Sequence, residues 1–320
     1  MNFLINVGRA WARLLTTDSK SPSVVGKLIR AILLLPLITI LIVAWQIRRY
    51  CGRGFVAEVK ADFGASFRCR LPDLIQSYIL LFRVWEPDLT QFIASRLRRG
   101  DVFIDVGANI GYFTLLASNK VGPEGKVVAI DALPSNYAEL VYNIGMSSNR
   151  DNVRAINRAV SDSHGTIKVY AGAPTNLGHA TTAPGDRKNL RFEASVEAAP
   201  LADLLLADEI RQARLLKIDV EGAEPSVLAG IGPFLRQCSQ DLEIVLELSP
   251  VWWTDPALTP EKVLAPLREA GFNTYRMEND YMPWRYLWPK AVRKVRRVGQ
   301  LADRHAKQID LVDEVRRVSP

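Results

Sequence analysis

The sequence predicts an α/β domain in which a mostly parallel β-sheet carries helices on both faces. The main observation is that short apolar runs with the composition of strands alternate with amphipathic stretches through the middle of the chain, as in repeated strand–helix units. The second is size, because 320 residues of which 48% are hydrophobic suffice to bury one large core. We therefore expect one main domain with extensions at its ends.

The predicted elements follow one another from residue 101 onward. Strands are expected at Asp101–Asp105, Lys126–Asp131, Val153–Ala159, Thr166–Tyr170, Leu215–Asp219 and Leu242–Leu248. Helices are expected at Tyr112–Asn119, Asn136–Met146 and Glu224–Leu228. Residues 172–200 are rich in Gly, Ala, Thr and Pro, which is typical of a loop excursion over the carboxyl edge of the sheet.

The net charge of +7 lies at the two ends of the chain. Residues 1–60 hold nine Lys and Arg against two acids and residues 281–320 hold ten against four, whereas residues 61–280 hold 22 against 28. Enzymes of nucleic acids more often carry a positive field on the catalytic domain itself, so a nucleic-acid partner is disfavoured. We divide the chain into an N-terminal amphipathic, membrane-associated segment (1–55), a main domain (56–280) and a basic aromatic C-terminal tail (281–320).

Cysteine usage fits a reducing compartment. Cys51, Cys69 and Cys238 lie far apart and form no C-x-x-C pair. This spacing argues against a disulfide framework and against a zinc site.

An apolar run predicts a hydrophobic helix near the N-terminus that associates with a membrane. Residues 31–47 run for 17 positions without a charge, and the flanking Arg30 and Arg48 suit an interface, as does Trp45. Such a helix would be about 25 Å long, slightly short of a hydrocarbon core. Because Pro36 could also kink it, the segment either spans the bilayer or lies in it. The alternative is a buried helix of a soluble protein.

The C-terminal tail has the chemistry of a membrane interface. Its aromatic residues are Tyr281, Trp284, Tyr286 and Trp288. Between Arg285 and Arg297 there are six basic residues and no acid. This combination fits an anionic membrane surface, although a solvated basic helix has the same composition. With two such ends, we expect a membrane-associated protein.

A glycine-containing loop follows the first predicted strand. In the run V-G-A-N-I-G, Gly107 and Gly111 allow sharp turns and a close approach of the backbone to a ligand, with Asn109 between them. Asp105 ends the strand just before the glycines. A carboxylate there would repel a pyrophosphate but suits a cofactor that carries an ammonium and a sulfonium group.

A second acid supports the same cofactor. Asp131 ends the next predicted strand, 24 residues beyond Gly107, where a carboxylate can accept hydrogen bonds from both hydroxyls of a ribose. Dinucleotide-binding enzymes share this feature, but the loop departs from their G-x-G-x-x-G pattern. Together the loop and its two acids favour S-adenosylmethionine over NAD.

Longer motifs around this loop resemble the FkbM family of methyltransferases, over roughly residues 85–279. The matching segments are WEPDLTQFI (85–93), GDVFIDVGANIGYFT (100–114), NLGHAT (176–181), LLKIDVEGAEPSVLAG (215–230), LELSP (246–250) and REAGF (268–272). KIDVEGAE is quite specific to that family, whereas the glycine loop is shared by many methyltransferases. One departure is AIDALP at 129–134, where the family usually reads FEP, so that Asp131 is a shorter acid than Glu.

The resemblance implies a Rossmann-like, class I methyltransferase fold for residues 56–280, with a mostly parallel seven-stranded sheet. It also implies transfer of a methyl group from S-adenosylmethionine to oxygen, commonly a hydroxyl of a sugar, polyketide or lipid-linked glycan. The residues expected to hold the cofactor are Glu86, Asp105, Gly107, Asn109, Gly111, Asp131 and Asp162.

Acids at the ends of the strands are the candidate catalytic residues. Because ligands of such sheets bind beyond the carboxyl ends of the strands, Asp105, Asp131 and Asp219 should cluster there. Asp219 and Glu221 are two positions apart and face the same side of an extended segment. Glu247, in the neighbouring strand, brings a third carboxylate.

Two roles for these acids stay open. A carboxylate whose pKa is raised by neighbouring acids can remove the proton of an attacking hydroxyl. Alternatively, the acids hold Mg²⁺, and we assign no metal. Both glutamates also have a structural interpretation. Glu221 could be the acid at the start of the next helix, and Glu247 could face the helices that cover the sheet.

Other residues near these motifs have both a functional and a structural interpretation. Lys217 is a candidate structural partner of the acids, and His179 in the loop excursion a candidate base over the cofactor. Trp252 and Trp253 either form a wall for the acceptor or cap the core.

The leading hypothesis is a membrane-associated O-methyltransferase that acts on a hydroxyl of a sugar, glycolipid or polyketide-type acceptor. Its catalytic domain is expected on the cytoplasmic side, where S-adenosylmethionine is made. One alternative is an RNA or amine methyltransferase, although no Asn-Pro-Pro-aromatic run follows the fourth strand. Another alternative is a catalytically inactive, membrane-tethered binding protein. The complete set of residues in the loop and at the strand ends argues against it.

Overall fold

The computed structural model describes residues 55–71, 73–172, 190–277, 285–286, 296–298 and 309–315, together with Ile32, Thr39, Val43 and Gln46. The chain divides into two compact units. The first unit comprises residues 1–92, 174–178 and 279–293, and the second comprises residues 93–173, 179–278 and 294–320.

The first unit contains a β-hairpin followed by a helix. β1 (Phe55–Lys60) pairs antiparallel with β2 (Ser66–Leu71), and Gly64 turns the chain between them with a φ of +99°. α3 (Leu74–Phe82) packs on β2. The side chain of Asp73 caps this helix by accepting the N–H of Gln76 at 2.9 Å.

Aromatic rings and a buried ion pair stabilise the first unit. The ring of Tyr286 lies 4.7 Å from that of Tyr78 and 5.1 Å from that of Phe82. Arg285 binds both carboxylate oxygens of Asp88, and both side chains are 3% exposed. The expectation of a membrane-interface position is therefore wrong for Tyr286, which is 4% exposed because its ring packs against aromatic neighbours of its own unit.

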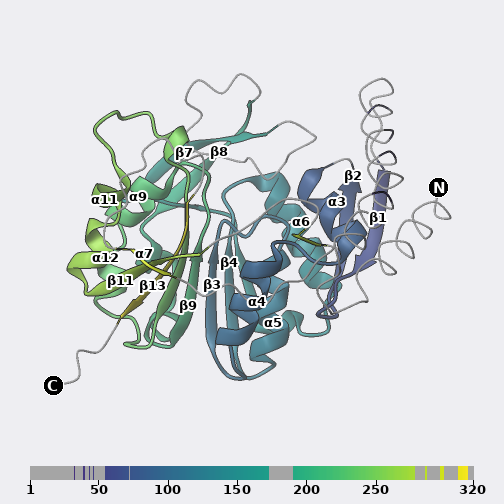
Figure 1. Ribbon diagram of the computed structural model, residues 1–320, viewed down its shortest axis with the longest axis horizontal. Coiled ribbons are helices and arrows are strands. Elements are labelled where there is room, and N and C mark those ends of the chain that lie inside the picture. The colour runs from purple at the N-terminus through teal and green to yellow at the C-terminus, as the bar shows by residue number, and fades with distance from the viewer. Residues whose placement is uncertain are drawn as a thin grey trace. The chain divides into compact units, whose positions relative to one another are not determined.

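The second unit is built on a mixed β-sheet (Figure 1). Among the described residues its strand order is β12-β11-β13-β10-β9-β3-β4-β5. The strands are β3 (Val102–Val106), β4 (Lys126–Ile130), β5 (Val153–Ile156), β9 (Ala213–Ile218), β10 (Glu243–Leu248), β11 (Phe272–Arg276), β12 (Arg296–Arg297) and β13 (Ile309–Val315). The strands from β10 to β5 are parallel, whereas β13 is antiparallel to both of its neighbours. Eight strands pair instead of the expected seven, because β12 extends the edge beside β11.

Helices cover both faces of the central strands, as the sequence predicts. Every residue of β3 is buried, so neither face of this strand meets solvent. α5 (Tyr112–Val121) contacts β3 and β4, and α6 (Pro134–Gly145) contacts β5. The remaining helices are α4 (Pro87–Arg96), α7 (Leu201–Leu204), α8 (Ala207–Arg211), α9 (Glu224–Ala229), α10 (Gly232–Leu235), α11 (Pro260–Val263) and α12 (Ala265–Glu269), with the short 3₁₀ helices η1 (Arg150–Asn152) and η2 (Pro250–Trp252).

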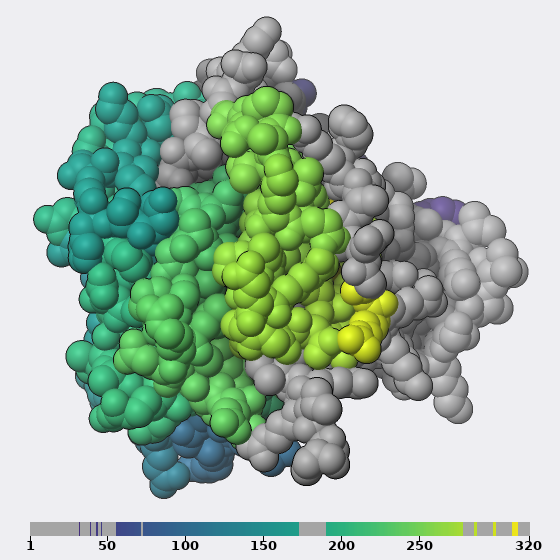
Figure 2. All heavy atoms as spheres, turned by 90° about the vertical axis from the view of Figure 1, so that its left-hand side faces the viewer, coloured from purple at the N-terminus to yellow at the C-terminus, as the bar shows by residue number. Residues whose placement is uncertain are grey.

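The C-terminal helices pack against one another and against the sheet. α11 and α12 both contact α9, and α12 also contacts β11. Figure 2 shows yellow-green residues of this region as a band on the surface, next to green residues that precede them in the sequence. Beneath them the core contains fully buried side chains such as Leu216, Phe234 and Leu246.

Part of the predicted C-terminal tail belongs to the sheet. β13 lies between β10 and β11, with Leu246 opposite Leu311 and Tyr275 opposite Val312. Ile309, Leu311 and Val312 are at most 2% exposed. The prediction of a tail from residue 281 is therefore wrong for 309–315, because this segment pairs with two strands and its apolar residues Ile309, Leu311 and Val312 are buried in the sheet.

A separate three-stranded sheet has the order β6-β8-β7 and consists of β6 (Ala159–Val160), β7 (Gly165–Ala171) and β8 (Arg191–Ala199). Residues 191–199 were expected within the loop excursion, but they form β8. The reason is that Val196 and Ala198 point into a small core while Ser195 and Glu197 face solvent. The single strand expected at 153–159 is likewise divided between the two sheets, at Asn157, whose amide donates to the carbonyls of Asp131 and Ala132.

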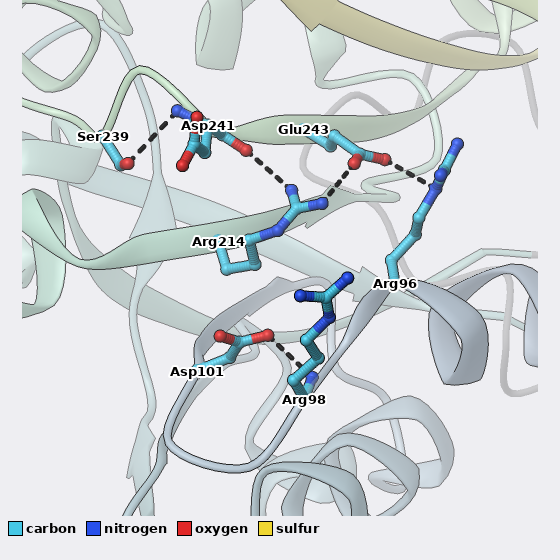
Figure 3. A network of polar contacts seen from close by, with 7 residues as sticks. All are labelled: Arg96, Arg98, Asp101, Arg214, Ser239, Asp241 and Glu243. Carbon is cyan, nitrogen blue, oxygen red and sulfur yellow. Dashed lines mark hydrogen bonds and ion pairs between the residues drawn. The ribbon is translucent and has the colours of Figure 1, made fainter.

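Ion pairs join the amino ends of the parallel strands (Figure 3). Arg214 at the start of β9 binds Glu243 at the start of β10, and the Nε of Arg96 lies 2.9 Å from the same carboxylate. The N–H of Arg98 donates to Asp101 at 2.7 Å, just before β3. These contacts stabilise the edge of the sheet opposite to the one where the glycine loop lies.

The predicted hydrophobic helix at 31–47 lies outside the described residues, except for Ile32, Thr39, Val43 and Gln46. Within the described part of the chain, no helix combines the length and the apolar character that crossing a membrane requires.

Candidate active site

The glycine loop connects β3 to α5 at the carboxyl edge of the sheet. The N–H groups of Gly107 and Ala108 both donate to the carbonyl of Ile130, at 2.9 and 3.0 Å. Gly107 has a φ of +79°, and a Cβ there would lie 1.8 Å from the carbonyl oxygen of Asp219. The expectation that Gly107 makes room for a ligand is therefore incomplete, because the backbone that follows β9 already demands a glycine at this position.

Gly111 has a similar requirement on the helical side of the loop. Its φ is +90°, and a Cβ would lie 2.6 Å from the side chain of Leu140 in α6. The two glycines thus fix how closely the loop approaches β9 and α6.

Asp131 anchors the loop to the end of β4. One carboxylate oxygen accepts the N–H of Asn109 at 2.7 Å, and the other accepts the N–H of Leu133 at 2.9 Å. Asn109 is in the left-handed region with a φ of +51°. Burial raises the pKa of Asp131 to about 7, although these two hydrogen bonds oppose the shift. Because each oxygen can accept a second hydrogen bond, binding of a ribose by Asp131 stays a prediction.

Asp105 is fully buried beneath the loop. Its Oδ2 accepts the hydroxyl of Thr114 at 2.6 Å, and its Oδ1 lies 3.5 Å from the Nζ of Lys217. Burial raises the pKa of Asp105, against the opposing charge of Lys217. Direct contact of Asp105 with the cofactor is an untested prediction, and in the structure the carboxylate supports the start of α5.

Lys217 links the loop to the candidate catalytic residues. Its ammonium donates to the carbonyl of Gly107 at 3.3 Å and to Asp219 at 3.2 Å, and it lies 5.4 Å from the ring centre of Phe113. The side chain is 3% exposed. These contacts match the interpretation of Lys217 as a structural partner of Asp105 and Asp219.

The three candidate catalytic acids converge. Asp219, Glu221 and Glu247 are each half-buried and each offer one carboxylate oxygen within 4.8 Å of the others. The expected extended segment is absent, because the chain turns at Glu221 and Gly222, whose φ values are +49° and +102°. Left-handed backbone is unusual for Glu and is often found at functional sites. The alternative in which Glu221 opens the helix does not hold, since α9 begins only at Glu224.

Glu224 is a buried residue that the sequence did not single out. Its carboxylate accepts the N–H of Gly222 at 2.6 Å and the indole N–H of Trp253 at 2.8 Å. Burial raises the pKa of Glu224 to about 7. Trp253 also packs against the hydrophobic core, which favours its capping role. In the sequence, Glu224 looks like an ordinary acid in the first turn of a helix, so nothing but its neighbours in space identifies it.

Two further residues that the sequence predicts for cofactor binding are Glu86 and Asp162. Glu86 belongs to the first unit, where it has a φ of +42° and its N–H donates to the hydroxyl of Tyr286. Asp162 follows β6 of the small sheet and accepts hydrogen bonds from the hydroxyls of Ser161, Ser163 and Ser226. Burial is the largest single influence and raises the pKa of Asp162, but the hydrogen bonds from the three hydroxyls together outweigh it, so the pKa is lowered.

His179, the candidate base over the cofactor, lies outside the described residues. Trp252 is the last residue of η2, and its backbone N–H donates to the carbonyl of Ser249 at 2.9 Å. The possible contact of Trp252 with an acceptor stays a prediction.

Comparisons with known proteins agree with the motifs. A model of the methyltransferase FkbM domain matches residues 105–274, just over half of the chain. Methyltransferase sdnD of Sordaria araneosa is 27% identical over 207 residues, which cover 56% of this chain and 76% of that protein. The 31-O-demethyl-FK506 methyltransferase FkbM of Streptomyces tacrolimicus is 32% identical over 206 residues, which cover 55% of this chain and 74% of that protein.

Among solved structures, methyltransferase FkbM from Methylobacillus flagellatus KT matches 74% of this chain and 53% of its own, with 13% sequence identity and a TM-score of 0.41.

The residues at the carboxyl edge fit S-adenosylmethionine. Asp105 and Asp219 both pair with the ammonium of Lys217, and Glu221 and Glu247 each bring a carboxylate oxygen within 4.8 Å of Asp219. Among the described residues this edge is therefore acidic, which suits a sulfonium and an ammonium group and opposes a pyrophosphate. The chain belongs to the FkbM family of methyltransferases, and its methyl donor is S-adenosylmethionine.

Proposed function

We propose that this enzyme methylates a hydroxyl oxygen of a sugar, glycolipid or polyketide-type acceptor. The observation that carries the proposal is the convergence of Asp219, Glu221 and Glu247 at the carboxyl edge. A hydroxyl must lose its proton as it takes up a methyl group, and a positioned carboxylate is suited to that task. The name of the relative from Streptomyces tacrolimicus also refers to an oxygen position of its substrate.

Asp219 is the best-placed base. When bound, S-adenosylmethionine supplies a methyl group on a sulfonium that is open to in-line attack. Asp219 is the first residue beyond β9, and its backbone N–H donates to the carbonyl of Val106 at 3.0 Å, directly before the glycine loop. The Nζ of Lys217 holds its carboxylate in one orientation. Asp219 would therefore take the proton of an acceptor hydroxyl that is aligned with the sulfonium.

Glu221 and Glu247 are suited to orienting the acceptor. Both side chains are half-buried, so each keeps a surface that a substrate can reach. Carboxylates accept hydrogen bonds from neighbouring hydroxyl groups, as a sugar presents them. This arrangement is suited to an acceptor that presents more than one hydroxyl.

The substitution Asp219→Asn tests the proposal. It preserves size, so the affinity for S-adenosylmethionine should stay close to that of the wild type. Turnover should fall by at least about 100-fold, the usual scale for losing a positioned acid–base group. The comparison variant is Glu221→Gln, for which a smaller loss is expected because it removes charge from an orienting residue. Near-normal turnover of Asp219→Asn on an acceptor that the wild type methylates would exclude Asp219 as the base.

A chelator distinguishes the two roles that the sequence left open for the acids. If Asp219 acts as a base without a metal, turnover should be the same with and without EDTA. Loss of turnover with EDTA and its return with Mg²⁺ would instead assign the acids to cation binding, for which their spacing is adequate.

We also propose that the protein associates with a membrane, with the methyltransferase domain on the cytoplasmic side. The support comes from the sequence: the apolar residues 31–47 and the basic ends of the chain. A lipid-linked or glycolipid acceptor would be consistent with that location.

A further inference from the structure

We propose that Glu224 is a positioning residue, which holds the turn that carries Glu221 against the segment that follows β10. The inference rests on the proposed function, because it concerns the geometry of the acids that would bind the acceptor. Its structural part, the attachment of the turn, can be tested without any acceptor.

The two oxygens of Glu224 bind two different parts of the chain. Oε1 accepts the backbone N–H of Gly222, four residues beyond the end of β9. Oε2 accepts the indole N–H of Trp253, just after η2. The side chain is fully buried, so water does not compete for these bonds. A single carboxylate thus connects the segment that follows β9 with the segment that follows β10.

The turn needs such a contact, because its backbone is in an uncommon conformation. Glu221 and Gly222 both have positive φ values, and the N–H of Ala223 donates back to the carbonyl of Val220 at 3.2 Å. A non-glycine residue with positive φ is energetically unfavourable and persists only when its surroundings fix it. The hydrogen bond from Gly222 to Glu224 lies directly beside Glu221 and fixes this turn.

The contact with Trp253 fixes the other segment. Trp253 follows Glu247 by six residues, and its backbone N–H donates to the carbonyl of Pro250 at 3.1 Å. Its ring packs against the core, so the indole N–H is held in place. Glu224 therefore sets the distance between the turn with Glu221 and the chain beyond Glu247.

The substitution Glu224→Gln separates positioning from mere packing. Glutamine has nearly the same shape but only one acceptor oxygen, so its NH₂ group must face either the N–H of Gly222 or the indole of Trp253. One donor then loses its partner. Replacing the indole as well, in Glu224→Gln with Trp253→Phe, removes that donor conflict.

The first measurement is hydrogen exchange of the peptide that covers residues 219–224, in the presence of S-adenosylhomocysteine. In Glu224→Gln we expect exchange of this peptide to become at least about 10-fold faster, the scale expected from loss of a buried hydrogen bond. The double variant should recover part of the protection. The affinity for S-adenosylhomocysteine should change less than about twofold, because none of these contacts involves residues 107–111.

The second measurement is methyl transfer to a panel of pyranosides. For any pyranoside that the wild type methylates, kcat should fall about 10-fold in Glu224→Gln and rise again in the double variant. The control is Glu209→Gln, a similarly buried glutamate that binds Arg154 and the N–H of Leu206. It should alter neither the exchange of residues 219–224 nor kcat.

Each outcome decides a separate point. Unchanged exchange at 219–224 in Glu224→Gln, or a double variant that is no better than the single one, would overturn the positioning role whatever the acceptor is. Faster exchange with unchanged kcat would also overturn it, since the turn would then be irrelevant to transfer. A wild type that methylates no hydroxyl acceptor would count against the proposed function, while the exchange result would still decide whether Glu224 holds the turn.

Discussion

Asp131 shows how one buried carboxylate shapes the cofactor loop. The sequence predicts that Asp131 binds a ribose, yet in the structure both of its oxygens accept backbone N–H groups, those of Asn109 and Leu133. Asn109 is in the left-handed region. The shorter side chain of Asp, compared with the Glu that is usual in the family, keeps the carboxylate close to the end of β4. Any contact with a cofactor must therefore share oxygens that already hold the loop.

The raised pKa of Asp131 has a consequence for stability. Its pKa is about 7 in the folded protein and 3.8 in an ordinary environment, so the folded state binds the proton more tightly. Between about pH 4 and pH 7 the unfolded chain is ionised while the folded chain keeps the proton. The free energy of unfolding should therefore decrease as the pH rises through this window and level off above it.

The test compares the wild type with Asp131→Asn, which lacks the titrating group. One unit of pKa corresponds to about 1.4 kcal/mol. The free energy of unfolding of the wild type, relative to that of Asp131→Asn, should therefore fall by up to about 4 kcal/mol between pH 4 and pH 7. Urea unfolding at a series of pH values measures it. Asp151→Asn, at an exposed carboxylate, serves as the control. Parallel curves for Asp131→Asn and the wild type would show that folding does not raise the pKa of Asp131.

At the scale of elements, contacts with the neighbouring backbone determine where the glycine loop lies. Gly107 must lack a Cβ because the backbone of Asp219 lies against it. The same contact brings the loop next to the candidate base. The loop after β3 and the turn after β9 are thus one structural unit, connected also by Lys217.

Gly107→Ala should therefore impair both folding and cofactor binding. The added Cβ would lie 1.8 Å from a backbone oxygen, so the loop or β9 must move. We expect a loss of stability of more than about 2 kcal/mol, of which only about 1–2 kcal/mol is the cost of left-handed backbone. Calorimetric titration should show loss of S-adenosylmethionine binding, with NAD as the comparison cofactor.

The matched control is Gly271→Ala, at a glycine that also has a positive φ, of +90°, but has open space around the new Cβ. Equal effects of the two substitutions would mean that backbone conformation alone explains Gly107.

The sequence predicted the central elements well, for a physical reason. Strands buried on both faces read as continuous apolar runs, and the acids at their ends stand out, as for Asp105 and Asp219. Convergence of Asp219 with Glu247 followed from parallel strands that end at one edge. The turn at Glu221 and the buried contacts of Glu224 were missed, because a polar residue beside a helix start has the same local pattern whether it is exposed or buried.

At the scale of the whole molecule, segments distant in sequence complete each unit. β13, from a region that composition marks as a basic tail, pairs with β10 and β11. Arg285 and Tyr286 are buried in the first unit, where they bind Asp88 and Glu86, which lie 197 and 200 residues earlier in the sequence. Pairings of this kind cannot be read from local pattern, since seven residues with a short apolar run carry too little information to place a strand.

The uneven charge of the chain leads to a last prediction, about membranes. If residues 31–47 enter a bilayer, the full-length protein should float with phosphatidylcholine vesicles even without anionic lipid, because burial of apolar side chains does not depend on charge. A chain that begins at residue 56 should bind only vesicles that contain phosphatidylserine. About 0.5 M NaCl should release this shorter chain but not the full-length protein, since salt screens the attraction of basic residues to anionic headgroups.

In sealed cells, the methyltransferase domain should resist protease added from outside. Full-length protein that stays in solution with every vesicle would place the apolar segment in a protein core, and digestion in intact cells would reverse the proposed orientation.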